Sequence, residues 1–341
     1  AGIGNDTFTG VFSVRGSDFD DILAGRIFEN DQFRPRAGDD DIDGRGGFGD
    51  ELRYSSTDLN VIIDMGADNQ TTSATTTSDG FGGTDTFIGI ENLRSGRGDD
   101  ELYGDVNDNR LRGGDGNDLL DGRGGNDDLR GEDGNDTLIG GEGDDTLYGG
   151  AGDNTLRGGA GDDTLIGADV YADPTSDFNR VDYRDALEGV TINLIGGLNS
   201  FSSTATSTDG VDGANIGTDT LVNVEMIFGS DFDDIVNVDG SFSGRGGSFI
   251  EFEGGGGDDT FNATGSGRVG YVNAAAGVDV DLEAGTATSV DPGDAAGIGN
   301  DTFTGVFSVR GSDFDDILAG RIFENDQFRP RAGDDDIDGR G

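Results

Sequence analysis

One leucine recurs at every ninth position between residues 95 and 166, in a segment that is otherwise rich in glycine, aspartate and asparagine. The cleanest copy of this nonad reads GGDGNDLLD and begins at Gly113. A helix is excluded, because the glycines would destabilise it at every turn. The period instead predicts a coil of short strands and tight turns that stacks on itself, with the leucines filling a thin core. These leucines, at position 8 of each nonad, are Leu102, Leu111, Leu120, Leu129, Leu138, Leu147, Leu156 and Leu165.

A carboxylate or amide side chain occupies position 6 of every nonad, two residues before the leucine. In a stacked coil these side chains would form a column of oxygens, which is tolerable only when cations lie between them. The position-6 residues are Asp100, Asn109, Asp118, Asp127, Asp136, Asp145, Asn154 and Asp163.

Three further modules share a different pattern, in which apolar residues alternate with polar ones around Ile63, Ile192 and Val280. Alternation of this kind predicts a half-buried strand. A Ser/Thr/Gly-rich loop follows, for example at 67–83 and 198–217, and then a closing segment that returns to the nonad pattern. The closing segments place Asp21, Asp234 and Asp316 at position 6, and isolated nonads place Asp40, Asp259 and Asp335 there.

The eight consecutive nonads resemble the RTX repeat, GGxGxDxUx, of secreted bacterial proteins. A single GGxGxD would carry little weight, but eight copies in register with an unchanged leucine make the resemblance specific. It implies an all-β fold, a right-handed parallel β-roll or β-solenoid with two nonads per coil and longer coils interspersed. It also implies Ca²⁺ between successive turns, bound by glycine carbonyls and position-6 side chains. Calcium takes six to eight oxygen ligands, which suits such a donor set.

Stacking of each nonad on the next but one predicts two metal columns. One column contains Asp100, Asp118, Asp136 and Asn154, and the other contains Asn109, Asp127, Asp145 and Asp163. Each asparagine would then lie at a column end. We expect calcium in the gaps of both columns, and further sites at Asp21, Asp40, Asp234, Asp259, Asp316 and Asp335.

A longer repeat contains the shorter ones. Residues 1–46 recur without change as residues 296–341, an offset of 296 − 1 = 295. The chain is thus one full period with the opening of the next, which predicts a tandem array in which adjacent copies meet end to end. Within the period we expect 1–46 as its start, an extended-coil module at 47–94, the eight-nonad roll at 95–166, a second extended-coil module at 167–227, nonads and irregular coils at 228–265, a third extended-coil module at 266–295, and the next start at 296–341.

Composition narrows the function. The chain has 70 acidic and 22 basic residues and a net charge of −48, which argues against a nucleic-acid partner. Without metal, such a chain should repel itself and stay expanded, so that calcium-binding free energy becomes folding free energy. No apolar stretch is long enough to insert into a membrane.

The residue types that the chain lacks limit the kinds of catalysis it could perform. The absence of His and Cys excludes Ser–His and Cys–His nucleophiles and the usual zinc sites. Because carboxylates are abundant, residue types alone do not exclude a glycosidase-like pair of a general acid and a general base. We nevertheless expect no enzyme, because most carboxylates follow the calcium pattern.

We therefore predict a calcium-stabilised structural repeat of a giant secreted RTX protein, serving as an extracellular filament, adhesin shaft or matrix element. The resemblance implies type I secretion of an unfolded chain. A second reading is a binding module whose Ser/Thr-rich loops contact a polysaccharide or a cell surface. A third is a calcium-binding appendage of a secreted enzyme.

Overall fold

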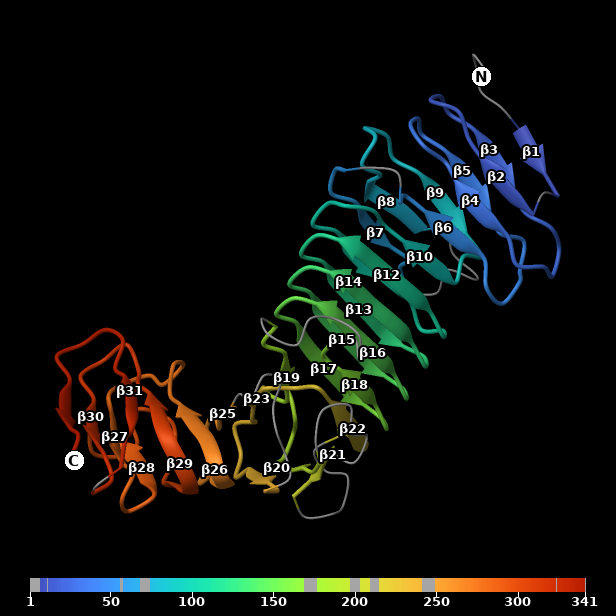
Figure 1. The fold of residues 1–341 in the computed structure, drawn as a ribbon. Helices are drawn as coiled ribbons and strands as arrows, with labels where there is room; N and C mark the ends of the chain where they lie inside the picture. Colours follow the sequence, from blue (N-terminus) through green and yellow to red (C-terminus); the bar gives the residue numbers. More distant parts are fainter. Residues whose placement is uncertain are drawn as a thin grey trace. The chain divides into compact units, whose positions relative to one another are not determined.

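The computed structural model describes residues 7–10, 12–55, 58–67, 74–168, 177–196, 203–208, 215–240, 249–322 and 324–340. Within these ranges the chain forms short strands joined by turns and bends, and no helix (Figure 1). The all-β fold class is therefore confirmed. Contacts divide the chain into two compact units, residues 1–158 with 167–172, and residues 159–166 with 173–341.

The nonads form parallel strands, as their period predicts. Each full nonad strand holds positions 7–9 of one nonad and 1–3 of the next, and positions 4–6 form the turn. Strands two nonads apart pair in parallel with the leucines in register, so that Leu111 lies beside Leu129 and Leu120 beside Leu138. All eight leucines are fully buried. The strands are β10 (Asn92–Arg94), β11 (Glu101–Tyr103), β12 (Arg110–Asp115), β13 (Leu119–Gly124), β14 (Asp128–Asp133), β15 (Thr137–Glu142), β16 (Thr146–Ala151), β17 (Thr155–Ala160) and β18 (Thr164–Ile166).

Glycine at position 4 is required by the turn between these strands. Gly134 has a φ of 143°, a conformation that residues with a Cβ rarely adopt. A Cβ at Gly134 would also overlap the carbonyl of Gly116 in the preceding coil. The turns can therefore stack at the spacing of parallel strands only because this position carries no side chain.

Three antiparallel meanders interrupt the parallel stack, one in each of the modules with an alternating strand. The middle strand of each runs antiparallel to both of its neighbours. The third strand pairs in parallel with the coil before it, and the first strand pairs in parallel with the coil after it. The first meander comprises β7 (Ile62–Asp64), β8 (Ala74–Ser78) and β9 (Thr86–Ile88), the second β20 (Val190–Leu194), β21 (Ser203–Ser207) and β22 (Thr218–Val222), and the third β27 (Val278–Asp281), β28 (Thr286–Ser289) and β29 (Asp301–Arg310).

The remaining strands extend the parallel stack within each unit. In the first unit they are β1 (Thr7–Thr9), β2 (Ser13–Arg15), β3 (Ile22–Ala24), β4 (Gln32–Arg34), β5 (Asp41–Asp43) and β6 (Glu51–Arg53). In the second they are β19 (Arg180–Asp182), β23 (Met226–Phe228), β24 (Ile235–Val238), β25 (Ile250–Glu253), β26 (Thr260–Gly270), β30 (Ile317–Ala319), β31 (Gln327–Arg329) and β32 (Asp336–Asp338). Strands β30, β31 and β32 lie 295 residues after β3, β4 and β5, so the two copies of the identical segment place strands at equivalent positions.

Candidate metal columns

The position-6 side chains stack directly over one another in the first unit. The backbone N–H of Asp100 donates to Oδ1 of Asp118 at 2.8 Å, and Asp118 and Asp136 continue the column to Asn154 at 2.9 Å for each step. In the second column the N–H of Asn109 donates to Asp127, and that of Asp127 donates to Asp145, both at 2.7 Å. One carboxylate oxygen of each aspartate thus links successive coils.

The other oxygen of these carboxylates faces an opening lined by backbone carbonyls. Across the described ranges, Oδ2 of Asp118, Asp127 and Asp136 is buried and accepts no hydrogen bond. A Cβ placed on Gly122 would overlap the Asp127 carboxylate and lie 2.7 Å from the carbonyl oxygen of Gly140. The same arrangement recurs at Gly131, beside Asp136 and Gly149, and at Gly140, beside Asp145 and Gly158. Because glycine has no side chain, a small space stays open in which a carboxylate oxygen and a carbonyl oxygen lie close together without a hydrogen-bond donor between them. We call this space a cradle. Its oxygen ligands suit a hard cation such as Ca²⁺.

Burial makes the ionised column costly without a cation. Burial, reinforced by the neighbouring carboxylates of the column, raises the pKa of Asp127 to about 8 and that of Asp118 to about 7. Burial also raises the pKa of Asp136 and of Asp145 to about 7. Where the chain is described, no three acidic side chains gather into one cluster that would hold a metal ion. The carboxylates are spaced one per coil, so an ion would take its remaining oxygens from the backbone.

The predicted sites outside the eight nonads fall into two kinds. Asp40 and Asp259 resemble the nonad aspartates, because each has a buried Oδ2 that, among the described atoms, accepts no hydrogen bond. Burial raises their pKa values to about 7 and about 10. Asp335 is half-buried in the last described coil and accepts the N–H of Asp316 at 2.9 Å.

Asp21, Asp234 and Asp316 form the second kind, in which a serine four residues earlier donates to the carboxylate. At Asp234 the Ser230 N–H donates to Oδ2 at 2.6 Å, and the Ser230 hydroxyl donates to Oδ1 at 2.9 Å. Equivalent bonds from Ser17 and Ser312 reach the other two carboxylates. Hydrogen-bond donors of the protein therefore partly stabilise these carboxylates, as a cation would at the aspartates whose Oδ2 accepts no hydrogen bond.

The two asparagines are placed differently from each other. Asn154 uses its amide nitrogen where an aspartate would present Oδ2, and donates to the carbonyl of Gly167 at 3.3 Å. Asn109 is followed by a further coil, because β10 pairs with both β12 and β6, and its amide nitrogen donates to the carbonyl of Glu91 at 3.2 Å. Its Oδ1 accepts the N–H of Asp105 in the same nonad, so the column passes from Asn109 to Glu91 and Asp50 without the usual link through Oδ1. The N–H of Asp50 donates to Glu91 Oε2 at 2.7 Å.

Sequence reasoning missed Asp31 and Asp50, which extend this column at coils of 19 residues instead of 18. Their separation equals that of Asp21 and Asp40, a signal that was present in the sequence. Asp50 has a buried Oδ2 that accepts no hydrogen bond from the described residues. Asp31 instead pairs with Arg26, whose Nε lies 2.9 Å from Oδ1, so an arginine provides the positive charge there.

A second ladder, at position 5, was also missed. The N–H of Asn135 donates to the side chain of Asn117, and that of Asp153 donates to Asn135, at 2.9 and 2.8 Å. These side chains are exposed, unlike those at position 6. Every nonad carries Asp or Asn at position 5, so the pattern alone could have predicted the ladder.

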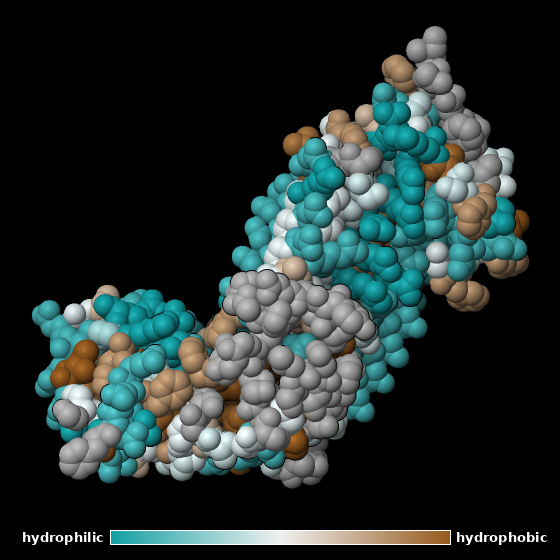
Figure 2. Space-filling view, in the orientation of Figure 1, coloured by the Kyte–Doolittle hydropathy of each residue, from teal (hydrophilic) through white to brown (hydrophobic). Residues whose placement is uncertain are grey.

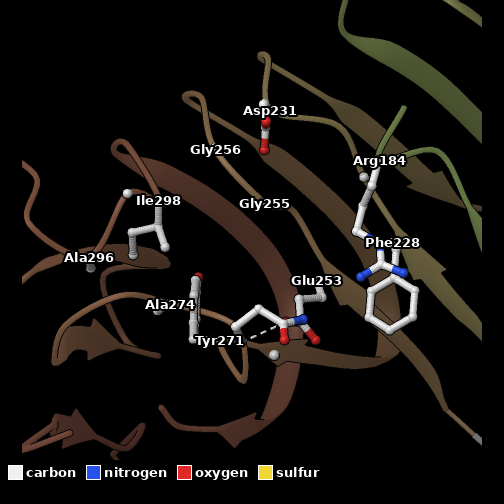
Figure 3. A pocket seen from close by; sticks show the side chains of 14 residues that line it. Arg184, Phe228, Asp231, Glu253, Gly255, Gly256, Tyr271, Ala274, Ala296 and Ile298 are labelled. Carbon is white, nitrogen blue, oxygen red and sulfur yellow. Dashed lines mark hydrogen bonds between the residues drawn. The ribbon is translucent and has the colours of Figure 1, made fainter. Parts of the chain in front are cut away.

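A pocket of about 170 Å³ in the second unit offers the best test of a catalytic reading (Figure 3). Two acidic residues, Asp231 and Glu253, line it, and Glu253 accepts two hydrogen bonds from Asn273, at 2.9 and 2.5 Å. Arg184 lies over the ring of Phe228 and pairs with both oxygens of Asp182. Glu253 and Arg184 of this pocket are thus each engaged with a protein partner, Asn273 and Asp182. No enzymatic domain is shown in the part of the chain that the structure describes.

One face of the molecule shows how polar and apolar residues are distributed on its surface (Figure 2). The visible face is mainly hydrophilic, with scattered apolar residues (Figure 2). None of the described segments is a helix long and apolar enough to cross a membrane. Residues 68–73, 197–202 and 209–214 of the Ser/Thr-rich loops lie outside the described residues, so polysaccharide contact through these loops stays a prediction.

Comparison with known proteins agrees with the geometry. The family model of the RTX calcium-binding nonapeptide repeat matches residues 79–120, 103–138 and 139–169. No curated protein matches the chain. The first match begins within the first meander, just before β9 returns to the nonad pattern. The resemblance read from the nonads is confirmed, and the matched part of the chain, residues 79–169, is an RTX β-roll repeat of the calcium-binding nonapeptide type.

Proposed function

We propose that this chain is a calcium-locked structural repeat of a giant secreted RTX protein, and that successive periods form an extracellular filament or adhesin shaft. The observation that carries the calcium role is the buried Oδ2 of Asp118, Asp127 and Asp136, which accepts no hydrogen bond from the described residues and, at Asp127 and Asp136, lies beside a glycine carbonyl. A divalent cation in each cradle would neutralise these carboxylates and tie successive coils together.

The third meander supports a continuous array. Its first two strands, β27 and β28, belong to one 295-residue period, whereas β29 begins at Asp301 in the next. β29 pairs antiparallel with β28 and parallel with β26. The boundary between periods therefore lies inside a hydrogen-bonded sheet. In this proposal the start of each period closes the meander of the period before it, and no flexible joint separates them.

The calcium concentration also determines in which compartment the repeat folds. RTX repeats are typical of secreted proteins. Extracellular calcium modules bind with dissociation constants of roughly 10⁻⁴–10⁻³ M, so cytosolic calcium would leave them empty. We propose that the chain crosses a type I exporter unfolded and folds outside by mass action, since calcium binds only the folded coil.

Circular dichroism of the 341-residue chain tests the calcium role. We expect a β-rich spectrum in millimolar calcium and the loss of most of this β signal at neutral pH in EDTA. Asp136→Ala should raise the calcium concentration at the folding midpoint about tenfold or more, whereas Asp115→Ala, at an exposed position, should leave it nearly unchanged. A β spectrum of unchanged amplitude in EDTA would overturn the calcium proposal.

The filament is tested separately by electron microscopy of chains with one, two and four periods. In calcium, the contour length should rise by an equal step for each period. Beads joined at variable angles would instead show a tether, and would leave the calcium role intact.

A further inference from the structure

Three buried tyrosines stand at equivalent places beside the three meanders. Tyr54, Tyr183 and Tyr271 are at most 5% exposed. Each lies seven residues before a valine that precedes or begins the first strand of a meander, at 61, 190 and 278. Each hydroxyl donates to an aspartate at the start of the third strand of the same meander. Their partners are Asp85, Asp219 (at 2.9 Å) and Asp301.

These three aspartates are the last members of metal columns. Oδ1 of Asp85 accepts the N–H of Asp40 at 2.9 Å, as a nonad aspartate accepts the N–H of the coil before it. Asp219 accepts the N–H of Asp163 at 3.1 Å, and Asp301 accepts that of Asp259 at 3.1 Å. Their other oxygen, which lies open in Asp118, Asp127 and Asp136, is the one that the tyrosine hydroxyl reaches at Asp85 and Asp219.

The fold explains why the columns stop at these aspartates. The next strand in the sheet is the antiparallel middle strand, β8, β21 or β28, which does not continue the parallel stack. On the far side of each meander a column begins again without a preceding carboxylate. There the N–H groups of Val61, Val190 and Val278 donate to Asp100, Asp234 and Asp316 at 2.7, 2.7 and 2.9 Å.

We propose that Tyr54, Tyr183 and Tyr271 are metal-independent caps that close the calcium columns at each meander. The hydroxyl takes the place that a cation takes in the nonads, so the last carboxylate is satisfied without an ion. The proposal rests on the calcium role argued above. It makes each meander a boundary, so that the columns on its two sides bind and lose calcium as separate segments, and the meander itself stays folded when calcium is removed.

The first test compares an asparagine substitution at a cap with one inside a column, in the full 341-residue chain. Asn at position 219 keeps the acceptor for Asp163 N–H, and its amide can donate to the Tyr183 oxygen. Asp219→Asn should therefore bind as many calcium ions as the unsubstituted chain in equilibrium dialysis. Asp127→Asn should lose about one ion or bind it about tenfold more weakly, because that carboxylate faces the cradle directly.

The two outcomes separate the cap from the calcium role itself. If Asp219→Asn loses calcium as Asp127→Asn does, position 219 holds an ion and the cap proposal is overturned, while the calcium role stands. If neither substitution changes calcium binding, the calcium role fails, and the caps fail with it.

Hydrogen exchange in the presence of a chelator gives an independent readout. Amides of β20 and β22 should stay protected after calcium is removed, while those of β13 and β15 exchange at least about tenfold faster than in calcium. Tyr183→Phe should abolish that protection, whereas Tyr148→Phe, at a half-exposed nonad tyrosine, should not. Equal loss of protection in the second meander and the nonads of the unsubstituted chain would overturn the proposal.

Discussion

A single aspartate in this fold performs two tasks with its two carboxylate oxygens. Oδ1 accepts the backbone N–H of the coil before, and Oδ2 either faces a cradle or meets a donor from the protein. The donor to Oδ2 is the backbone N–H of Ser230 at Asp234, the backbone N–H of Arg26 at Asp31 and the hydroxyl of Tyr183 at Asp219. At Asn154 the amide nitrogen itself takes the place of the oxygen. The group that meets Oδ2 thus differs from coil to coil, and in our proposal this neighbouring group, more than the position-6 residue itself, determines whether a coil binds a cation.

The raised pKa values of the open carboxylates predict how the metal-free chain responds to pH. The folded state holds protons on Asp118, Asp127 and Asp136 up to pH about 7 to 8, whereas an unfolded aspartate releases its proton near 3.9. Their contribution to stability is therefore fully present below pH about 4 and is lost as pH rises through 7 to 8. Calcium-depleted protein should melt at a higher temperature at pH 5 than at pH 8.

Thermal melts followed by circular dichroism measure this directly, with metal removed on a chelating resin. Calcium should reverse the trend, because its ligands must be deprotonated, so that calcium affinity rises with pH. A metal-free melting temperature that is higher at pH 8 than at pH 5 would show that the open carboxylates do not control the stability of the roll.

At the scale of strands, the cradle depends on glycine at nonad position 1. A Cβ at Gly122 would overlap Asp127, whereas a Cβ at Gly124 in the same strand would lie 3.8 Å or more from its neighbours. Neither residue needs a positive φ. Gly122→Ala should therefore weaken calcium binding about tenfold or more without removing a charge, and Gly124→Ala should have little effect. Calcium titrations of the two variants test this, and equal affinities would place the ion elsewhere.

The sequence predicts the strands and their register well wherever a single repeat period determines them. The nonad fixes the spacing of Leu111, Leu129 and Leu147, so their register followed from counting. The antiparallel middle strands did not follow, because alternation predicts a strand but not its direction. The tyrosine caps were missed for a related reason. Tyr54 and Tyr183 meet their aspartates across 31 and 36 residues, and intervening loops of different length hide the equivalence.

At the scale of the whole chain, stability in a stacked fold is a sum of contacts between neighbouring coils. A coil at an end has lost one neighbour, and here the net charge of −48 adds repulsion wherever cations are missing. Segment 296–341 is the start of a second period and is identical to segment 1–46. Ending the chain before residue 296 therefore removes the neighbouring coils at the point where one period meets the next, and shows what the start of one period contributes to the period before it.

Ending the chain at residue 295 should loosen the third meander even in saturating calcium. The truncation removes β29, which pairs with both β26 and β28, and it deprives Tyr271 of Asp301. A control chain ending at residue 320 keeps β29 and β30 and lacks only the last two strands. Amides between residues 260 and 289 should exchange at least about tenfold faster in the 295-residue chain than in the control. Equal protection would mean that each period completes its own fold, and that adjacent periods are joined as separate bodies.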